Sequence, residues 1–111
     1  MSIESIPNPA RKRIYTVEHI CPEFTCVCPK TGQPDFATIT VTYEPDEFLV
    51  ELKSLKLYFW SFRDKGAFHE DITNQILDHL VENLKPHSMT VVGDFNVRGG
   101  ISTVVTAKYP S

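Results

Sequence analysis

Residues 37–62, ATITVTYEPDEFLVELKSLKLYFWSF, decide the fold because their hydrophobic pattern changes its period partway along. Within residues 37–43 apolar residues alternate with threonines, which is the period of a strand, and β-branched residues fall on both faces. Residues 44–47 contain a proline and predict a turn. Residues 50–62 then predict a helix, because a single apolar stripe at helical spacing is formed by Leu52, Leu55, Phe59 and Phe62.

The sequence on both sides of this stretch supplies the remaining elements. A weaker alternation predicts a first strand over residues 14–24. A second helix is predicted over residues 69–84, with Pro86 preventing its continuation and with an apolar stripe of Ile72, Ile76, Leu80 and Leu84. Alternating residues then predict strands over 89–97 and 101–107, joined by a glycine turn.

The order strand, strand, helix, helix, strand, strand predicts an α+β fold, in which a four-stranded antiparallel sheet carries both helices on one face. Residues 1–13 contain Pro7 and Pro9 and no periodicity, so we expect an N-terminal arm that is loose or covers an edge. Residues 14–111 are expected to form one domain. The sheet would have two open edges and a threonine-rich outer face, which favours a homo-oligomer.

Composition narrows the class of protein. A chain of 111 residues with 41% hydrophobic and 23% charged residues is typical of one soluble globular domain. The formal net charge of -3 gives no general attraction to phosphate backbones, so we expect no direct nucleic-acid partner. We expect no membrane span and a cytoplasmic location, because no apolar run is long enough and no signal-peptide core is evident.

A thiol and a carboxyl group lie seven positions apart, at Cys28 and Asp35. The connector between them contains Pro29, Gly32 and Pro34, which restrict the backbone to a few tight paths that can fold Asp35 back toward Cys28. A thiolate is a nucleophile, and whatever it attacks needs a proton, which a nearby carboxyl group can donate. This pair is the central functional hypothesis from the sequence.

Each member of this pair also has a plainer explanation. Cys28 could be a structural cysteine, and Asp35 could cap a turn at the start of a strand. Cys21, Cys26 and Cys28 with a histidine could bind zinc, although their spacing differs from that of paired Cys-x-x-Cys motifs. Three clustered cysteines otherwise favour reduced thiols over a secreted disulfide scaffold. No glycine motif of a Rossmann dinucleotide site is present.

Other polar residues are candidates for ligand binding. Lys53 and Lys56 are neighbours on the first helix and are either solvated surface or an anion site. His69-Glu70 starts the second helix, where the carboxylate could also accept hydrogen bonds from the amidine edge of a guanine-like ring. Arg98-Gly99-Gly100 is a hairpin turn that could also bind an anion.

Together these residues resemble the QueF family of NADPH-dependent 7-cyano-7-deazaguanine reductases, the nitrile reductases of queuosine biosynthesis. Residues 51–58, Glu-Leu-Lys-Ser-Leu-Lys-Leu-Tyr, match every position of the family's signature helix. The match extends to the Cys28 to Asp35 loop, to His69-Glu70 and to Arg98-Gly99-Gly100. The chain length is similar to the single-module form of the family. That form implies a tunnelling fold assembled as two facing pentamer rings.

The resemblance also implies a role for each matching residue. Cys28 would add to the substrate nitrile and form a covalent thioimide, and Asp35 would protonate the nitrile-derived nitrogen. Two hydride transfers from NADPH would then give the amine 7-aminomethyl-7-deazaguanine. The expected substrate contacts are Val50, Glu51, Leu52, His69 and Glu70. The expected cofactor contacts are Leu52, Lys53, Lys56, Arg98 and Gly99.

The same resemblance implies no resident metal, and it gives Cys21 and Cys26 no role beyond structure. Two alternatives remain at this stage. One is a GTP cyclohydrolase-like zinc hydrolase on the same fold, which would need metal ligands. The other is a non-catalytic purine- or pterin-binding scaffold, which would bind its ligand without a covalent bond to Cys28.

Overall fold

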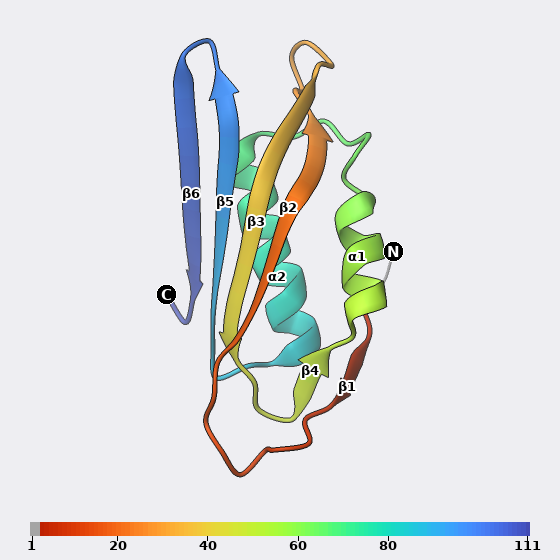
Figure 1. Ribbon diagram of the computed structural model, residues 1–111, viewed down its shortest axis with the longest axis vertical. Helices are drawn as coiled ribbons and strands as arrows, with labels where there is room; N and C mark the ends of the chain where they lie inside the picture. The colour runs from red at the N-terminus through yellow and green to blue at the C-terminus, as the bar shows by residue number, and fades with distance from the viewer. Residues whose placement is uncertain (1–2) are drawn as a thin grey trace.

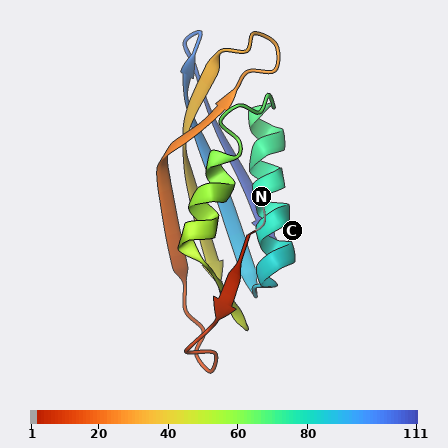
Figure 2. The same ribbon diagram turned by 90° about the vertical axis from the view of Figure 1, so that its right-hand side faces the viewer.

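The computed structural model describes residues 3–111 and shows a four-stranded antiparallel sheet covered by two helices (Figure 1). The strands of this sheet are β2 (Val17–Val27), β3 (Pro34–Glu44), β5 (Ser88–Arg98) and β6 (Ile101–Tyr109), in the order β2-β3-β5-β6. The helices are α1 (Leu52–Trp60) and α2 (His69–Leu84), and both lie on one face of the sheet (Figure 2). The predicted α+β fold is therefore confirmed.

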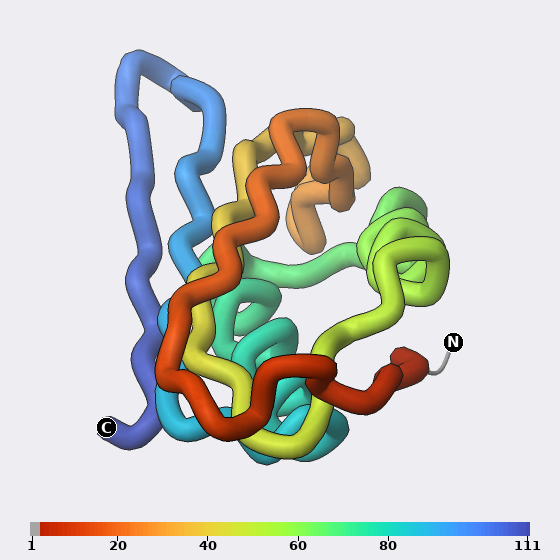
Figure 3. The backbone as a smooth tube through the Cα atoms, turned by 60° about the horizontal axis from the view of Figure 1, so that its bottom comes forward, coloured from red at the N-terminus to blue at the C-terminus, as the bar shows by residue number. Residues whose placement is uncertain are grey.

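A second, two-stranded sheet was not predicted. It pairs β1 (Ser5–Pro7) with β4 (Phe48–Val50), and each of these strands has only three residues, too few to show a period in the sequence. Figure 3 shows the N-terminal segment (red) running along the bottom end of the molecule, where the Asn8 N–H donates to the Glu47 carbonyl at 2.8 Å. The first residues of the described chain therefore lie against the turn between β3 and α1.

The predicted bounds of two elements were wrong. The first strand is Val17–Val27 rather than 14–24, because its pairing with β3 shifts register between Cys21 and Phe24 and breaks the alternation. The first helix begins at Leu52 rather than residue 50, because the Glu51 carboxylate caps it by accepting hydrogen bonds from backbone N–H groups of the first turn, each at 2.8 Å.

The core lies between the sheet and the helices. Every second residue of β3 from Ala37 to Tyr43 is at most 2% exposed, and the threonines between them point to the other face. Helix α2 packs close to β5 at Gly93, where a Cβ atom would lie 2.7 Å from Thr73 Oγ1. This packing holds the N-terminal end of α2 against the upper half of the sheet (Figure 1).

Candidate active site

The loop between β2 and β3 folds back on itself. The Gly32 N–H donates to the Cys28 carbonyl at 2.8 Å, and the Cys28 N–H donates to the Gln33 carbonyl at 2.8 Å. Gly32 has a φ of 73°, a left-handed conformation that glycine adopts without steric cost. In the β2–β3 pairing Asp35 lies directly opposite Cys26. The turn therefore brings the Asp35 residue to the end of β2, and Cys28 is the first residue after that strand.

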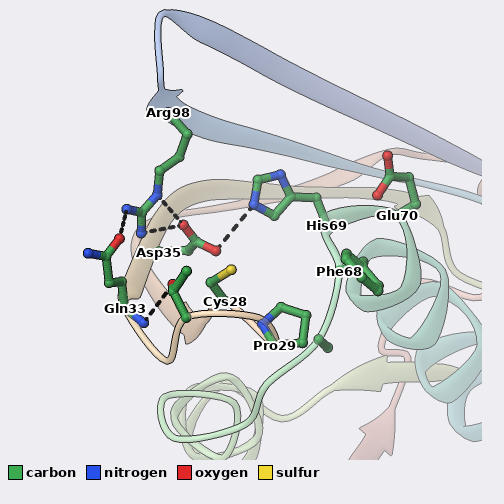
Figure 4. Close-up of a pocket in the computed structure, with 10 residues that line it drawn as sticks. Cys28, Pro29, Gln33, Asp35, Phe68, His69, Glu70 and Arg98 are labelled. Carbon is green, nitrogen blue, oxygen red and sulfur yellow. Dashed lines mark hydrogen bonds and ion pairs between the residues drawn. The ribbon is translucent and has the colours of Figure 1, made fainter.

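Asp35 is a buried carboxyl group with partners from two distant elements. Its residue exposure is only 6%. Arg98, the last residue of β5, donates to Asp35 Oδ1 from Nε at 2.6 Å, and its Nη2 lies 2.6 Å from the same oxygen. His69, the first residue of α2, places Nε2 at 3.4 Å from Asp35 Oδ2. Both carboxyl oxygens therefore have defined neighbours (Figure 4).

The His69 ring has a fixed orientation. It stacks on Phe95 with a centroid distance of 3.9 Å and an interplanar angle of 5°. Its backbone carbonyl accepts a hydrogen bond from Thr73 Oγ1 at 2.9 Å. Helix α2 and strand β5 thus hold the imidazole beside Asp35, and the imidazole can exchange a proton with the carboxyl group through Nε2.

These side chains surround one cavity of about 330 Å³, which we call the Cys28 cavity. Figure 4 shows Cys28 and Asp35 on the side of the β2–β3 loop, with His69 and Glu70 on the side of α2. The volume is in the range of small-molecule sites. The cavity is lined by Cys28, Pro29, Thr31, Gln33, Asp35, Ala67, Phe68, His69, Glu70 and Arg98.

The environment of Cys28 favours its thiolate. The pKa of Cys28 is lowered from its ordinary value, mainly by a hydrogen bond from the Thr31 side chain and further by the backbone N–H groups of Thr31 and Lys30. Partial burial and the charge of Asp35 oppose this shift. A half-buried thiol that keeps a lowered pKa beside a carboxylate is suited to nucleophilic attack within the cavity.

The other two cysteines have different surroundings. Cys26 is fully buried, and desolvation, followed by the charge of Asp35, raises its pKa to about 11. Cys21 is half-buried and lies on the N-terminal side of the register shift in β2. All three thiols are free, and within residues 3–111 no group of three or more His, Cys, Asp or Glu side chains is placed to hold a metal ion.

Six of the predicted site residues do not line the Cys28 cavity: Gly99 in the β5–β6 turn, and five that lie from the end of β4 into α1. Val50 is buried in the core, and Glu51 caps α1, where backbone N–H groups of Lys53 and Ser54 lower its pKa. Leu52 and Lys56 line a second cavity of about 270 Å³ between α1 and β2, which we call the α1 groove. Lys53 is exposed on α1. The single chain therefore does not bring these residues to Cys28.

The structure also adds residues that the sequence did not single out. Thr31 and Gln33, within the β2–β3 loop, and Phe68, just before α2, line the Cys28 cavity. Thr31 could have been identified from the sequence because it lies three positions after Cys28, where a hydroxyl group can reach the sulfur across a turn. Gly99 is the residue after Arg98 in the β5–β6 turn and has a φ of 56°.

Comparisons with known proteins show which family the chain is similar to. A family model described as QueF-like protein matches residues 34–111. A protein of Thermomicrobium roseum named NADPH-dependent 7-cyano-7-deazaguanine reductase is 63% identical over 107 residues, which cover 96% of this chain and 84% of that protein. A protein of Nitrosococcus oceani with the same name is 60% identical, covering 96% of this chain and 83% of that protein.

A solved structure gives independent support for the fold. The crystal structure of the archaeosine synthase QueF-Like in the apo form matches with a TM-score of 0.75 at 19% identity, covering 86% of this chain and 91% of that one. This likeness concerns the fold alone, and it confirms the tunnelling fold that the resemblance implied. The family match and the identities near 60% together show that the chain belongs to the QueF-like protein family.

Proposed function

We propose that this protein uses NADPH to reduce the nitrile group of 7-cyano-7-deazaguanine to an aminomethyl group. The observation that carries the proposal is the Cys28 cavity, in which a thiol with a lowered pKa and a buried carboxyl group face the same space. Relatives at 60–63% identity bear the name of this activity. The chain is then an NADPH-dependent oxidoreductase, working in the cytoplasm on a precursor of the queuosine modification of tRNA.

The first step is addition to the triple bond. The Cys28 thiolate attacks the nitrile carbon, which is electrophilic but unreactive toward weaker nucleophiles. A bond forms between Sγ and that carbon, and one π bond of the nitrile becomes a lone pair on nitrogen. Asp35 donates a proton to this nitrogen, which gives a neutral covalent thioimide. His69 Nε2, 3.4 Å from Asp35 Oδ2, is placed to return a proton to the carboxylate.

When bound, NADPH would supply two hydrides to the carbon of the former nitrile group, the first while Cys28 is still attached to it. After the first hydride, the carbon–sulfur bond breaks and the thiolate leaves, so the substrate becomes an imine. The second hydride and further protons complete the primary amine. The balance requires two NADPH and two protons beyond those on the cofactor for each nitrile reduced. Cys28 returns to its starting form, and Asp35 and His69 remain available to move the protons.

Glu70 and His69 are proposed to hold the deazaguanine ring. Glu70 lies on the cavity wall opposite Cys28, in the exposed first turn of α2 (Figure 4). A carboxylate accepts two hydrogen bonds side by side, which matches the ring N–H and exocyclic amine of a guanine-like edge. Phe68, which is 57% exposed, offers an apolar surface beside this edge. The ring would then present its nitrile toward the sulfur.

The residues expected on β4 and α1 are proposed to act in a neighbouring subunit's site. Within one chain these residues lie away from the Cys28 cavity. Leu52 and Lys56 line the α1 groove, and Val50 is buried in the core. Strands β2 and β6 are the two outer strands of the main sheet and can pair with other copies. Lys53 and Lys56 of one copy would then meet the NADPH phosphates at the site of another, in two facing pentamer rings.

The activity is tested by incubating the protein with the nitrile and NADPH and following the loss of nicotinamide absorbance. We expect two NADPH consumed per amine formed, and an adduct on Cys28 by intact mass spectrometry when NADPH is withheld. Absence of turnover by well-folded protein would reject the proposal. Turnover of GTP with stoichiometric zinc, or nitrile binding without an adduct, would support the alternative functions instead.

The assembly is tested separately by light scattering at working concentration. A species several times the 12.6 kDa chain mass is expected. A monomer that remained fully active would contradict the shared site.

A further inference from the structure

One exposed face of α1 combines positive charge with an aromatic ring. We propose that the adenosine end of NADPH lies along this face, with its adenine ring stacked on Trp60 and its 2′-phosphate paired with Arg63. The inference rests on the function proposed above, in which the nicotinamide end of NADPH occupies the Cys28 cavity of a neighbouring copy. It names two residues that are not among the expected cofactor contacts, and one of them would distinguish NADPH from NADH.

The residues of this face follow one another along the helix. Lys53, Lys56 and Trp60 are three and four positions apart, which makes them neighbours on a helix surface. All three are exposed, and Trp60, the only tryptophan of the chain, is 50% exposed. Arg63 is exposed in the turn that follows α1. The core is contacted by other residues of the helix, such as the buried Phe59, so packing of α1 does not explain this face.

Two cations lie over the Trp60 ring. Lys56 Nζ is 5.2 Å from the ring centroid, and the guanidinium carbon of Arg63 is 5.6 Å from it. Contacts of this kind favour defined positions for both side chains. Among the residues that the structure describes, neither cation takes part in an ion pair with a carboxylate. Both charges are therefore available to a phosphate, although the chain as a whole has a net charge of -3.

The α1 groove opens beside the ring. Figure 1 shows α1 next to β2, and the groove between them is lined by Trp60 and by apolar side chains such as Pro22 and Leu52. Its volume of about 270 Å³ is below the range of about 300–1,000 Å³ for sites that hold a whole ligand, so it suits part of a dinucleotide. Glu23 also lines the groove, and its carboxylate can accept a hydrogen bond from the exocyclic amine of adenine.

The order of side chains along α1 matches the order of groups in NADPH. Lys53 and Trp60 are seven residues apart, about 10 Å along a helix. In NADPH one ribose separates the pyrophosphate from the adenine, and this ribose carries the 2′-phosphate. If Lys53 and Lys56 meet the pyrophosphate, the adenine reaches Trp60 and the 2′-phosphate reaches Arg63. Arginine pairs with phosphate through two donors, and NADH lacks this phosphate.

A contact between proteins is the other common explanation for an exposed tryptophan. It accounts for the ring but not for the cations on both sides of it, because burying unpaired charges in an interface is unfavourable. A nucleotide supplies both a flat ring and the negative charge that pairs with Lys56 and Arg63. The combination of side chains therefore favours the nucleotide.

The single tryptophan allows a direct binding experiment. The full-length protein is titrated with adenosine 2′,5′-bisphosphate, without the nitrile or NADPH, while Trp60 fluorescence is followed. We expect saturable quenching, because a stacked purine lies against the ring. Adenosine 5′-monophosphate, which lacks the 2′-phosphate, should bind at least about 10-fold more weakly. Fluorescence that does not respond up to about 1 mM bisphosphate, the upper end of usual KM values, would overturn the proposal. Fluorescence that changes with protein concentration and not with ligand would also overturn it, since the ring would then pack between copies.

Arg63→Ala tests the contact with the 2′-phosphate. We expect the KM for NADPH to rise by about 10-fold with kcat within about 2-fold of the wild type, and the KM for NADH to stay within about 2-fold. The matched control is Arg13→Ala, which removes an exposed arginine before β2 and should leave both KM values unchanged. Equal effects of Arg63→Ala on NADPH and NADH would overturn the assignment.

Trp60→Ala tests the stack. It should raise the KM for NADPH and for NADH alike by about 10-fold, and Trp60→Phe, which keeps an aromatic ring, should restore most of the loss. If Trp60→Ala fails to fold, judged by circular dichroism and particle size, the bisphosphate titration and Arg63→Ala decide. Wild-type KM values in folded Trp60→Ala would overturn the proposal. Quenching by the bisphosphate without turnover of the nitrile would instead reject the proposed function and leave this binding site in place.

Discussion

The end of strand β2 and the loop that follows it hold two thiols only two residues apart, and their chemistry differs. Cys26 is fully buried opposite Asp35, and desolvation raises its pKa to about 11. Cys28 lies half-buried in the turn, where hydrogen bonds lower its pKa. The same negative charge on Asp35 raises the pKa at both positions. Desolvation of Cys26 and hydrogen bonds from the turn to Cys28 therefore make the difference.

The two thiols show that cysteines two positions apart can have different roles, one in the packing of the core and the other in chemistry. A strand residue that faces the core contributes buried surface, and its thiol remains protonated at neutral pH. Two residues later the strand has ended, and the backbone N–H groups of the turn are free to stabilise a negative charge.

Removal of the Cys28 thiol should give the largest effect, and removal of the Cys26 thiol is its matched control. In Cys28→Ala the proposed nucleophile is absent, so we expect turnover to fall by at least about 10³-fold and the adduct with the nitrile to disappear. Cys26→Ala keeps Cys28 and should still form the adduct. Intact mass spectrometry and NADPH consumption measure both outcomes. Wild-type turnover by Cys28→Ala would show that the half-buried thiol has no chemical role.

Asp35 lies beside both thiols and is the next test. In Asp35→Asn the side chain keeps its shape but cannot donate an acidic proton, so we expect the rate of adduct formation to fall by about 10²- to 10⁴-fold. The matched control is Asp94→Asn, on the exposed face of β5, opposite Thr38. An adduct rate equal to that of the control would mean that the nitrogen takes its proton from another group.

The buried thiol should matter more for stability than the reactive one. Cys26→Ser places a hydroxyl group where the structure offers an apolar environment, which should lower the free energy of unfolding by about 1–3 kcal/mol. Cys28→Ser changes a half-exposed position and should cost less than about 0.5 kcal/mol. Urea unfolding at neutral pH measures both values. Equal losses for the two variants would contradict the difference in burial.

The smallest expected effect concerns the donor that distinguishes Cys28. Thr31→Val removes the side-chain hydrogen bond to the sulfur, so the pKa of Cys28 should rise toward its ordinary value. Less thiolate is then present at pH 7, and alkylation by iodoacetamide should slow by about 2- to 5-fold, with the pH–rate profile shifted to higher pH. Thr38→Val, on the outer face of β3, is the control. A profile shifted to lower pH would show that the Thr31 hydroxyl group raises the pKa of Cys28 instead of lowering it.

Much of the fold could be predicted because its signals are local. The alternation of residues 37–43 and the stripe of residues 69–84 each depend on neighbours within a few positions, and both elements are present in the structure. The errors arose where local pattern is weak. The β-bulge near Cys21 hides the true span of the first strand, and β4 is too short to show any period.

By itself the sequence determined the order of the four strands of the main sheet and the two helices, and it placed a thiol and a carboxyl group at the two ends of one constrained loop. Proline and glycine act on the backbone where they stand, so that part of the site is local. Only the tertiary structure decided what surrounds the pair. Arg98 is 63 positions from Asp35 and His69 is 34 positions from it. Their approach depends on a bulge in one strand and on the packing of a helix against the sheet, which no short stretch of sequence encodes.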